Sequence, residues 1–364
     1  MTDVLVSATA TASERAVTGL LDEHRHLRAQ LSEQPGLLTM AADPWSGTSA
    51  LLHTTLDGLE YSVTLADART CTTVGELARR IAAAAVASRA PEASRWWRHQ
   101  SPPSDTDGLR LGHALHRKGL DAERLRQGDG PDSRLLADAL RMACVLGDGP
   151  TLVAVDHLDR LLDRLDETSA RECLGVMRTV RQALPDLQLL LVGRREGPVE
   201  RALRDPGHPL YRAGQSIDIR RPVPQRFIDD ARHHELSMTS VPQNLLGVAA
   251  ELAAGVPFLT WQIIDLAAGD GAEPQRALHG WHRLRALTDA QTGQSFDLLR
   301  RVHPLAQQVV AAIAIDGQPY KLEPNNKRIY DALARLRQLG VAFQPRERTW
   351  ALASPLLLAW VRDH

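Results

Sequence analysis

The chain has 364 residues, enough for two or three domains that each bury a hydrophobic core. Its 43 basic and 44 acidic residues give a formal net charge of −1, so no overall field favours nucleic acid or a membrane surface. The three cysteines lack the spacing of a zinc site, and neither a signal-peptide pattern nor a long apolar segment is present. We therefore expect a cytoplasmic protein without a membrane partner.

The first part of the chain alternates between strand-like and helix-like segments. Charge and leucine at helical spacing predict a lead-in helix over 12–34, within an N-terminal segment 1–34. An α/β domain with a doubly wound parallel sheet is predicted over 35–221. Its expected strands are 36–41, 60–68, 151–156, 187–193 and 216–221, and its expected helices are 49–57, 73–89, 133–147 and 166–183. Residues 90–132, rich in Pro, Gly, Ser and charge, predict an insertion or mobile linker with a short helix near 109–127.

The pattern changes after residue 221. Residues 222–285 are helical throughout and predict a helical subdomain. Residues 286–364 predict one helix over 295–317, a second over 326–340 and a hairpin over 341–354. This order is typical of a winged helix-turn-helix.

The segment ADPWSGTSALL, which starts at Ala42, connects a predicted strand to a predicted helix as a phosphate-binding loop does. Gly47 and Ser49 match the P-loop pattern G-x-x-x-x-G-K-[ST], whereas Ala42 replaces its first glycine and Thr48 its lysine. Backbone amides bind phosphate in such a loop, and the serine hydroxyl binds Mg²⁺. Losing the lysine weakens phosphate binding by roughly 10- to 100-fold. The loop is thus either a weakened nucleotide site or one that binds no nucleotide.

The segment TLVAVDHLDRL has the Walker B form, in which a buried strand delivers an aspartate, here Asp156, to the Mg²⁺ shell. His157 follows, where an acid normally orients the attacking water. It could accept a proton near neutral pH, or it marks a site that no longer hydrolyses, which is the hypothesis we favour. A further apolar run, LQLLLVGRREG, ends before Arg194 and Arg195. These arginines could supply the missing lysine charge, or they could be solvated loop residues.

Together these segments resemble the STAND ATPases, an AAA+-related family of archaeal-type P-loop ATPases close to origin-recognition initiators. Three further segments carry the resemblance: HPLYRAGQSIDIRRP, AAELAAGVPFLTWQI and WALASPLLLAWVRDH. The second contains Gly255 and Pro257 at the family's Gly-x-Pro helix junction, and the third has Ser354 where the family has aspartate. The resemblance implies a P-loop NTPase sheet, a helical subdomain and a C-terminal winged helix, with ATP or ADP and Mg²⁺ clamped between them.

The resemblance also implies which residues contact the nucleotide. Gly47, Thr48 and Ser49 correspond to the phosphate loop, and Gly255 to Pro257 to the wall beside the adenine. Asp156 and Ser49 correspond to the Mg²⁺ ligands, and Arg194 is the candidate replacement for the lysine. Because Ala42, Thr48 and His157 depart from the pattern, the family's hydrolysis does not carry over.

The sequence therefore predicts a pseudo-ATPase, a regulatory or scaffold protein that binds nucleotide weakly or not at all. Its expected partner is another protein or a second copy of itself. One alternative is an active ATP hydrolase in which Arg194, Arg195 or a partner's arginine replaces the lysine. The other is a DNA-binding initiator or regulator, because residues 281–364 hold 12 basic and 7 acidic residues, a net of +5. The predicted DNA contacts are Lys327, Arg328, Arg346 and Arg348.

Overall fold

The computed structural model describes residues 15, 17–33, 36–94, 97, 106–147, 149–233, 241–267, 272–322, 326–346 and 349–364. Its contacts divide the chain into two compact units, each treated by itself below. The sheet unit consists of Arg25–Ala42 and Thr55–Ile219. The C-terminal unit consists of Met1–His24, Asp43–Thr54 and Arg220–His364. Among the helices that the structure describes, none is long and apolar enough to cross a membrane.

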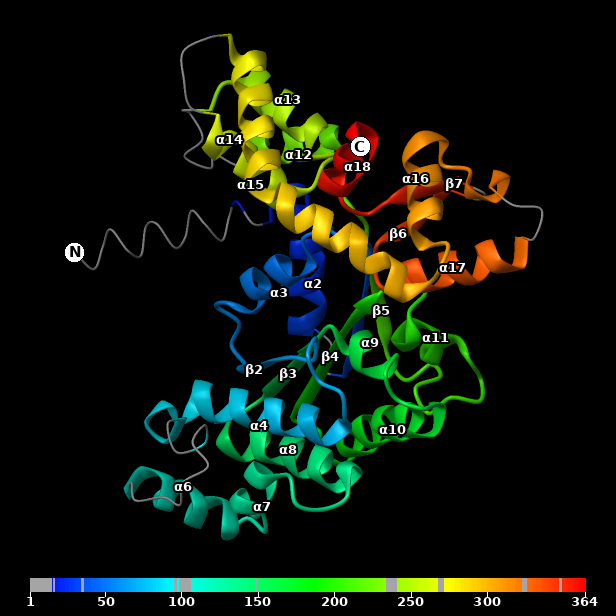
Figure 1. Ribbon diagram of the computed structural model, residues 1–364. Coiled ribbons are helices and arrows are strands. Elements are labelled where there is room, and N and C mark those ends of the chain that lie inside the picture. Colours follow the sequence, from blue (N-terminus) through cyan, green and yellow to red (C-terminus); the bar gives the residue numbers. More distant parts are fainter. Residues whose placement is uncertain are drawn as a thin grey trace. The chain divides into compact units, whose positions relative to one another are not determined.

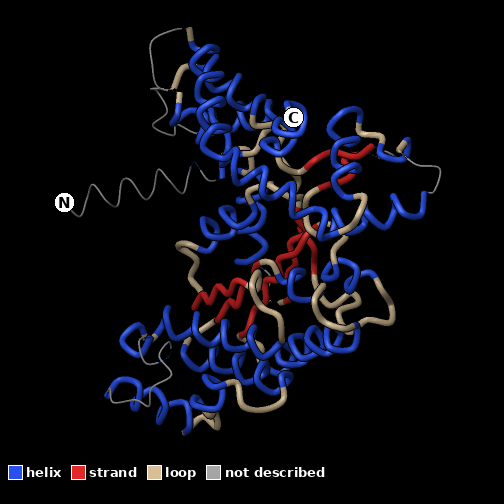
Figure 2. Tube along the Cα trace, viewed as in Figure 1, coloured by secondary structure: helices blue, strands red, loops and turns tan. Residues whose placement is uncertain are grey.

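The sheet unit is built on a parallel sheet of five strands in the order β2-β3-β4-β1-β5. Strands are red in Figure 2. The strands are β1 (Leu37–Ala42), β2 (Ser62–Asp67), β3 (Thr151–Asp156), β4 (Leu187–Arg194) and β5 (Gln215–Ile219). Every residue of β1 and β3 is buried, which explains why they are continuous apolar runs. All five predicted strands are confirmed, with ends displaced by at most two residues.

Helices of the sheet unit share one hydrophobic core with the sheet (Figure 1). They are α4 (Val74–Arg89), η1 (Pro91–Ala93), α6 (Thr106–His116), α7 (Ala122–Gln127), α8 (Asp132–Leu146), α9 (Leu158–Leu162), α10 (Glu167–Ala183) and α11 (Pro198–Arg204). Leu77, Ile81 and Ala85 recur at helical spacing on the buried face of α4. Thr73 caps this helix by accepting a hydrogen bond from the Glu76 amide at 3.1 Å. The predicted helices from 73 to 183 outside the linker are confirmed.

The predicted insertion or mobile linker over 90–132 contains helices in the residues that the structure describes. Two helices, α6 and α7, replace the single short helix predicted near 109–127, because Asp121 caps the second by accepting the Arg124 amide. Leu111, Leu115 and Leu125 are buried in the core of the sheet unit. Their helical spacing was obscured by the surrounding polar residues.

The C-terminal unit is mainly helical. It contains α12 (Pro224–His233), α13 (Gln243–Leu252), α14 (Pro257–Leu266), α15 (Glu273–Val302), α16 (Ala306–Asp316), η2 (Pro319–Lys321), α17 (Asn326–Gln338), the antiparallel strands β6 (Ala342–Arg346) and β7 (Thr349–Leu352), and α18 (Pro355–Asp363). The order helix, helix, hairpin is the one expected for a winged helix, and that assignment itself stays a prediction. Both α2 (Leu21–Glu33) and α3 (Thr48–Leu56) contribute residues to each unit.

Two predicted helices have different bounds in the structure. The helix predicted over 295–317 is wrong, because the chain leaves α15 at His303, which is extended with φ −160° and ψ 141°. Pro304 disfavours a helical conformation at the preceding residue and has no amide to donate. Of the predicted lead-in helix over 12–34, residues 21–33 form α2, and the Leu21 amide donates to Asp230 at 3.2 Å. Residues 18–20 are not helical, and 12–14, 16 and 34 lie outside the described residues.

Candidate functional site

The predicted site residues are divided between the two units. Gly47, Thr48, Ser49, Gly255 and Pro257 belong to the C-terminal unit. The two remaining residues belong to the sheet unit, where Asp156 ends β3 and Arg194 ends the neighbouring strand β4. The carboxyl ends of both parallel strands lie at the same edge of the sheet. Each group is described separately.

The loop after β1 has the backbone features of a phosphate-binding turn. Trp45 and Gly47 have left-handed φ values of 63° and 89°, and this region is uncommon for tryptophan. The Leu51 amide donates to the Gly47 carbonyl at 2.9 Å, so α3 begins directly after Gly47. The first amides of an α-helix have no acceptor within the helix, and a P-loop uses such amides to bind phosphate. Ala42 ends β1 in extended pairing, so a glycine is not needed there.

Gly47 lies between two other segments of the C-terminal unit. A Cβ atom at this position would be 3.4 Å from Leu20 Cδ1 and 3.7 Å from Pro257 Cγ. The structure therefore brings two predicted site residues, Gly47 and Pro257, together. It adds Leu20, which sequence reasoning missed because an apolar residue before a helix is no signal of a loop contact.

Gly255 has a packing role. Its φ is +75°, and a Cβ atom there would be 2.1 Å from the Pro222 carbonyl oxygen. Only glycine allows the two backbones to approach this closely. A direct contact between Gly255 and a nucleotide stays a prediction.

The Thr48 side chain, in the lysine position, forms a short hydrogen bond within the loop. Its Oγ1 atom lies 2.6 Å from Ser46 Oγ, and Ser46 is buried. This position therefore contributes no positive charge and holds a hydroxyl that already has a partner. The loop keeps the backbone part of a phosphate site and lacks its cationic part.

At the sheet edge, Asp156 and His157 are held by local hydrogen bonds. The buried Asp156 carboxylate accepts the His157 amide at 2.8 Å. Arg69 Nη2 lies 2.8 Å from His157 Nε2. Because a guanidinium can only donate, Nε2 must accept, and the neutral ring carries its proton on Nδ1. The lone pair with which Nε2 would act as a base is therefore already used.

Asp67 adds a second carboxylate to this edge. It ends β2 and is the register partner of Asp156. Its Oδ1 accepts the Arg69 amide at 2.8 Å, and its Oδ2 lies 3.7 Å from the Arg69 guanidinium. Sequence reasoning missed both residues, although an aspartate at a strand end was a usable signal. The pairing of β2 with β3 was not apparent from the sequence.

Arg194 is already ion-paired within the sheet unit. Its guanidinium donates to the Asp163 carboxylate through two nitrogens, at 2.6 and 3.0 Å. Such a bidentate pair fixes the orientation of the arginine and neutralises its charge. The prediction that Arg194 replaces the missing lysine is untested, and the pair makes this replacement more costly.

Asp159 anchors the loop that follows β4. It is 3 % exposed and accepts the Arg194 and Val199 amides at 2.6 and 3.1 Å. Burial raises its pKa from the ordinary value of 3.8 to about 6, against the opposing effects of Arg194 and these amides. The Asp159 carboxylate thus caps two backbone amides of this loop.

Asp159→Asn is expected to alter the pH dependence of stability. Between about pH 4 and pH 6 the folded chain keeps a proton that the unfolded chain has lost, so Asp159 lowers the free energy of unfolding as pH rises. Asparagine cannot titrate, so the free energy of unfolding of the variant relative to wild type should rise by about 2–3 kcal/mol across this window. Urea unfolding of both proteins at pH 4.5 and pH 7 measures the effect. Parallel pH dependence would contradict a raised pKa.

The predicted DNA contacts are only partly described. Lys327 and Arg328 are exposed at the start of α17. The side chain of Arg346 and all of Arg348 lie outside the described residues. DNA contact through the hairpin therefore stays a prediction.

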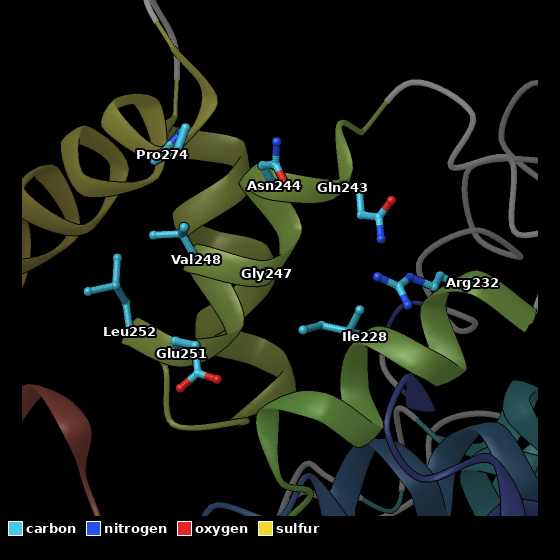
Figure 3. A pocket seen from close by; sticks show the side chains of 9 residues that line it. All are labelled: Ile228, Arg232, Gln243, Asn244, Gly247, Val248, Glu251, Leu252 and Pro274. Atoms are coloured by element: carbon cyan, nitrogen blue, oxygen red, sulfur yellow. The ribbon is translucent and has the colours of Figure 1, made fainter.

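An open groove of ≈ 550 Å³ lies in the C-terminal unit, between α12, α13 and the start of α15 (Figure 3). Arg232 and Gln243 point toward one another across it. Its lining contains none of the predicted nucleotide or DNA contacts. The groove is therefore separate from the candidate site.

No protein-family model matches the sequence, and no curated protein matches it. A Walker-type ATPase of Pyrococcus abyssi has a similar fold, with a TM-score of 0.65 and 20% identity over 94% of this chain and 95% of that one. The ORC2 protein of Aeropyrum pernix, solved in ADPNP-ADP complexes, has a TM-score of 0.52 and 12% identity over 98% and 92% of the two chains. A STAND protein of Pyrococcus horikoshii has a TM-score of 0.38 and 9% identity over 93% of this chain and 42% of that one. This similarity is too low to support an argument.

These similarities confirm the predicted fold class. Both of the more similar structures are matched over more than nine tenths of their length, so the resemblance includes the helical C-terminal part as well as the sheet. At these identities the likeness concerns the fold. The chain shares the α/β fold of the Walker-type ATPase and of ORC2.

Proposed function

We propose that this chain is a cytoplasmic regulatory or scaffold protein that binds Mg-nucleotide weakly and does not hydrolyse it. The observation that carries the proposal is the hydrogen bond between Thr48 and Ser46, because Thr48 occupies the position at which a phosphate loop has its lysine. Its working surface contacts another protein or a second copy of the chain. Three free cysteines, of which Cys144 and Cys173 have pKa values raised by burial, are consistent with a reducing compartment.

Weak binding is supported by what the loop retains. The start of α3, the left-handed Gly47 and the hydroxyl of Ser49 are the backbone and metal parts of a phosphate site. Asp156, buried at the end of β3, is the corresponding Mg²⁺ partner. A cationic contact to phosphate contributes roughly 1.5–3 kcal/mol, and this part is missing at position 48.

The absence of hydrolysis is supported by the residues at the sheet edge. His157 Nε2 accepts from Arg69 and so cannot take a proton from water while this bond persists. Arg194 is neutralised by Asp163. An active hydrolase would have to break both interactions before the transition state could form.

Calorimetric titration with Mg-ADP and Mg-ATP tests the proposal, with Asp156→Ala as the control variant. We expect a Kd of about 10–100 μM for wild type, that is, about −6 to −7 kcal/mol. We also expect weaker binding by Asp156→Ala and no phosphate release by either protein. No heat and no thermal shift at millimolar nucleotide would contradict binding. Phosphate release that depends on Asp156 would instead support the active hydrolase.

Duplex DNA is a second proposed partner, favoured by the exposed face of α17. Lys327, Arg328 and Arg335 are exposed on this helix together with Tyr330, which is 64 % exposed. Cationic side chains beside an exposed aromatic ring are typical of a surface that contacts a phosphate backbone. The opposite face, with Ile329, is buried in the core.

A further inference from the structure

Arg221 joins three segments of the C-terminal unit. Its backbone amide donates to Asp43 Oδ2 and its Nη2 to the Pro44 carbonyl, both at 3.3 Å. The same Nη2 donates to the Ala353 carbonyl. The guanidinium carbon lies 5.1 Å from the centre of the Phe343 ring, which is within the range of a cation–π contact.

These contacts connect the phosphate loop to the C-terminal hairpin. Asp43 and Pro44 are the first residues after β1, and the Asp43 carbonyl accepts the Ser46 amide, which closes the turn before Gly47. At the other end, Phe343 lies in β6, and Ala353 lies between β7 and the cap of α18. The Ala353 amide donates to the Val341 carbonyl, so its position is fixed by the hairpin.

The arginine is partly buried, and its Nε atom is buried without a hydrogen-bond partner among the described residues. Burial lowers its pKa to about 10, while the Asp43 carboxylate acts in the opposite direction. It therefore stays charged at neutral pH. A partly buried charge is stabilised by its partners, so a shift of the loop or of the hairpin that removes them carries a cost. Because one nitrogen donates to both carbonyls, a displacement on one side alters the bond on the other.

We propose that Arg221 is the positioning residue that transmits the state of the phosphate loop to the C-terminal hairpin and α18. The inference rests on the proposed nucleotide binding, since a bound phosphate would change the loop. Phosphate at the amides of the loop repositions the turn that contains Pro44. Arg221 then shifts relative to the Ala353 carbonyl and loosens or tightens the junction of β7 with α18.

Hydrogen exchange of residues 341–357 with and without Mg-ADP tests the link in wild type, Arg221→Met and Arg220→Met. Arg220 is exposed and serves as the matched control. We expect nucleotide to change exchange by about fivefold or more in wild type and Arg220→Met. Arg221→Met should bind nucleotide without this change. An unchanged response in Arg221→Met, or no response in wild type that binds nucleotide, would overturn the proposal.

A second arm needs no nucleotide. Asp43→Asn perturbs the loop directly. It should change the hydrogen-exchange rates of residues 341–357 in the protein that keeps Arg221, but not in Arg221→Met. If wild type binds no nucleotide, the proposed function fails while this arm still decides the role of Arg221. Equal effects of Asp43→Asn in both backgrounds would refute the link. Should Arg221→Met not fold, Arg221→Lys keeps the charge but not the planar fork, and a diminished response is expected.

Discussion

Thr48→Lys is expected to raise the affinity for Mg-ADP and Mg-ATP by roughly 10- to 100-fold. The substitution removes the hydroxyl that bonds to Ser46 and places an ammonium group directly after Gly47. Thr48 is partly exposed, so the longer side chain can extend from the loop without entering the core. The gain should be greater for ATP than for ADP, because the lysine of a P-loop spans the β- and γ-phosphates.

Calorimetric titration of Thr48→Lys and Thr48→Met against both nucleotides measures this gain. Methionine has a similar length but no charge, so the difference between the two variants isolates the ammonium group. If Thr48→Lys binds no more tightly than Thr48→Met, phosphate does not lie near position 48. Because Arg69 still holds His157, we expect the lysine variant to bind more tightly without hydrolysing ATP.

Ser49→Ala and Asp156→Ala should each lower the affinity for Mg-nucleotide by about 10-fold or more, and the double variant should lose little beyond the larger single effect. The Ser49 hydroxyl and the Asp156 carboxylate are predicted ligands of the same Mg²⁺ ion. Removing either one weakens the binding of that ion, so the other ligand then contributes less to the affinity. Ser49 belongs to the C-terminal unit and Asp156 to the sheet unit. Non-additive losses would therefore indicate that both oxygens bind one metal ion.

Together with the parent protein, these single and double variants form a double-mutant cycle. Their nucleotide affinities are best measured in the Thr48→Lys background, where the weakest variant still binds measurably. Titrations in EDTA are the control, because affinities without metal should be nearly the same for all four proteins. Strictly additive losses would mean that Ser49 and Asp156 act on separate parts of the ligand. Equal losses in EDTA would mean that the substitutions damage the protein and do not remove metal ligands.

The sheet was predictable because its chemistry is local. Parallel strands buried on both faces are mostly apolar, and TLVAVD and LQLLLVG show this without reference to any other residue, although Thr151, Asp156 and Gln188 are buried polar exceptions. The glycine and serine of the phosphate loop were also recognisable from spacing alone. The division of α15 from α16 at Pro304 was readable in principle, since proline has a local effect on the backbone.

The rest depended on contacts between segments far apart in the chain. The ion pair of Arg194 with Asp163 does not follow from either segment, and the role of Arg194 as a phosphate ligand stays a prediction. The approach of Arg69 to His157 requires β2 to lie beside β3, and their register does not follow from either strand. For Arg221, the partners on either side are 178 residues before it and 132 after it. Apolar spacing indicates which face of an element is buried, but not which polar group it meets.

The helix α15 crosses the predicted boundary between the helical subdomain and the winged helix at residues 285–286. Its 30 residues form one rod about 45 Å long. Trp281 and Leu284 are buried in one half and Leu299 in the other, whereas none of the residues between them is fully buried. Between these buried residues the helix packs against α18, where the rings of Phe296 and Trp360 lie 5.1 Å apart and Arg285 pairs with Asp363. A tilt of about 10° at one end would displace the other by roughly 8 Å, given this length.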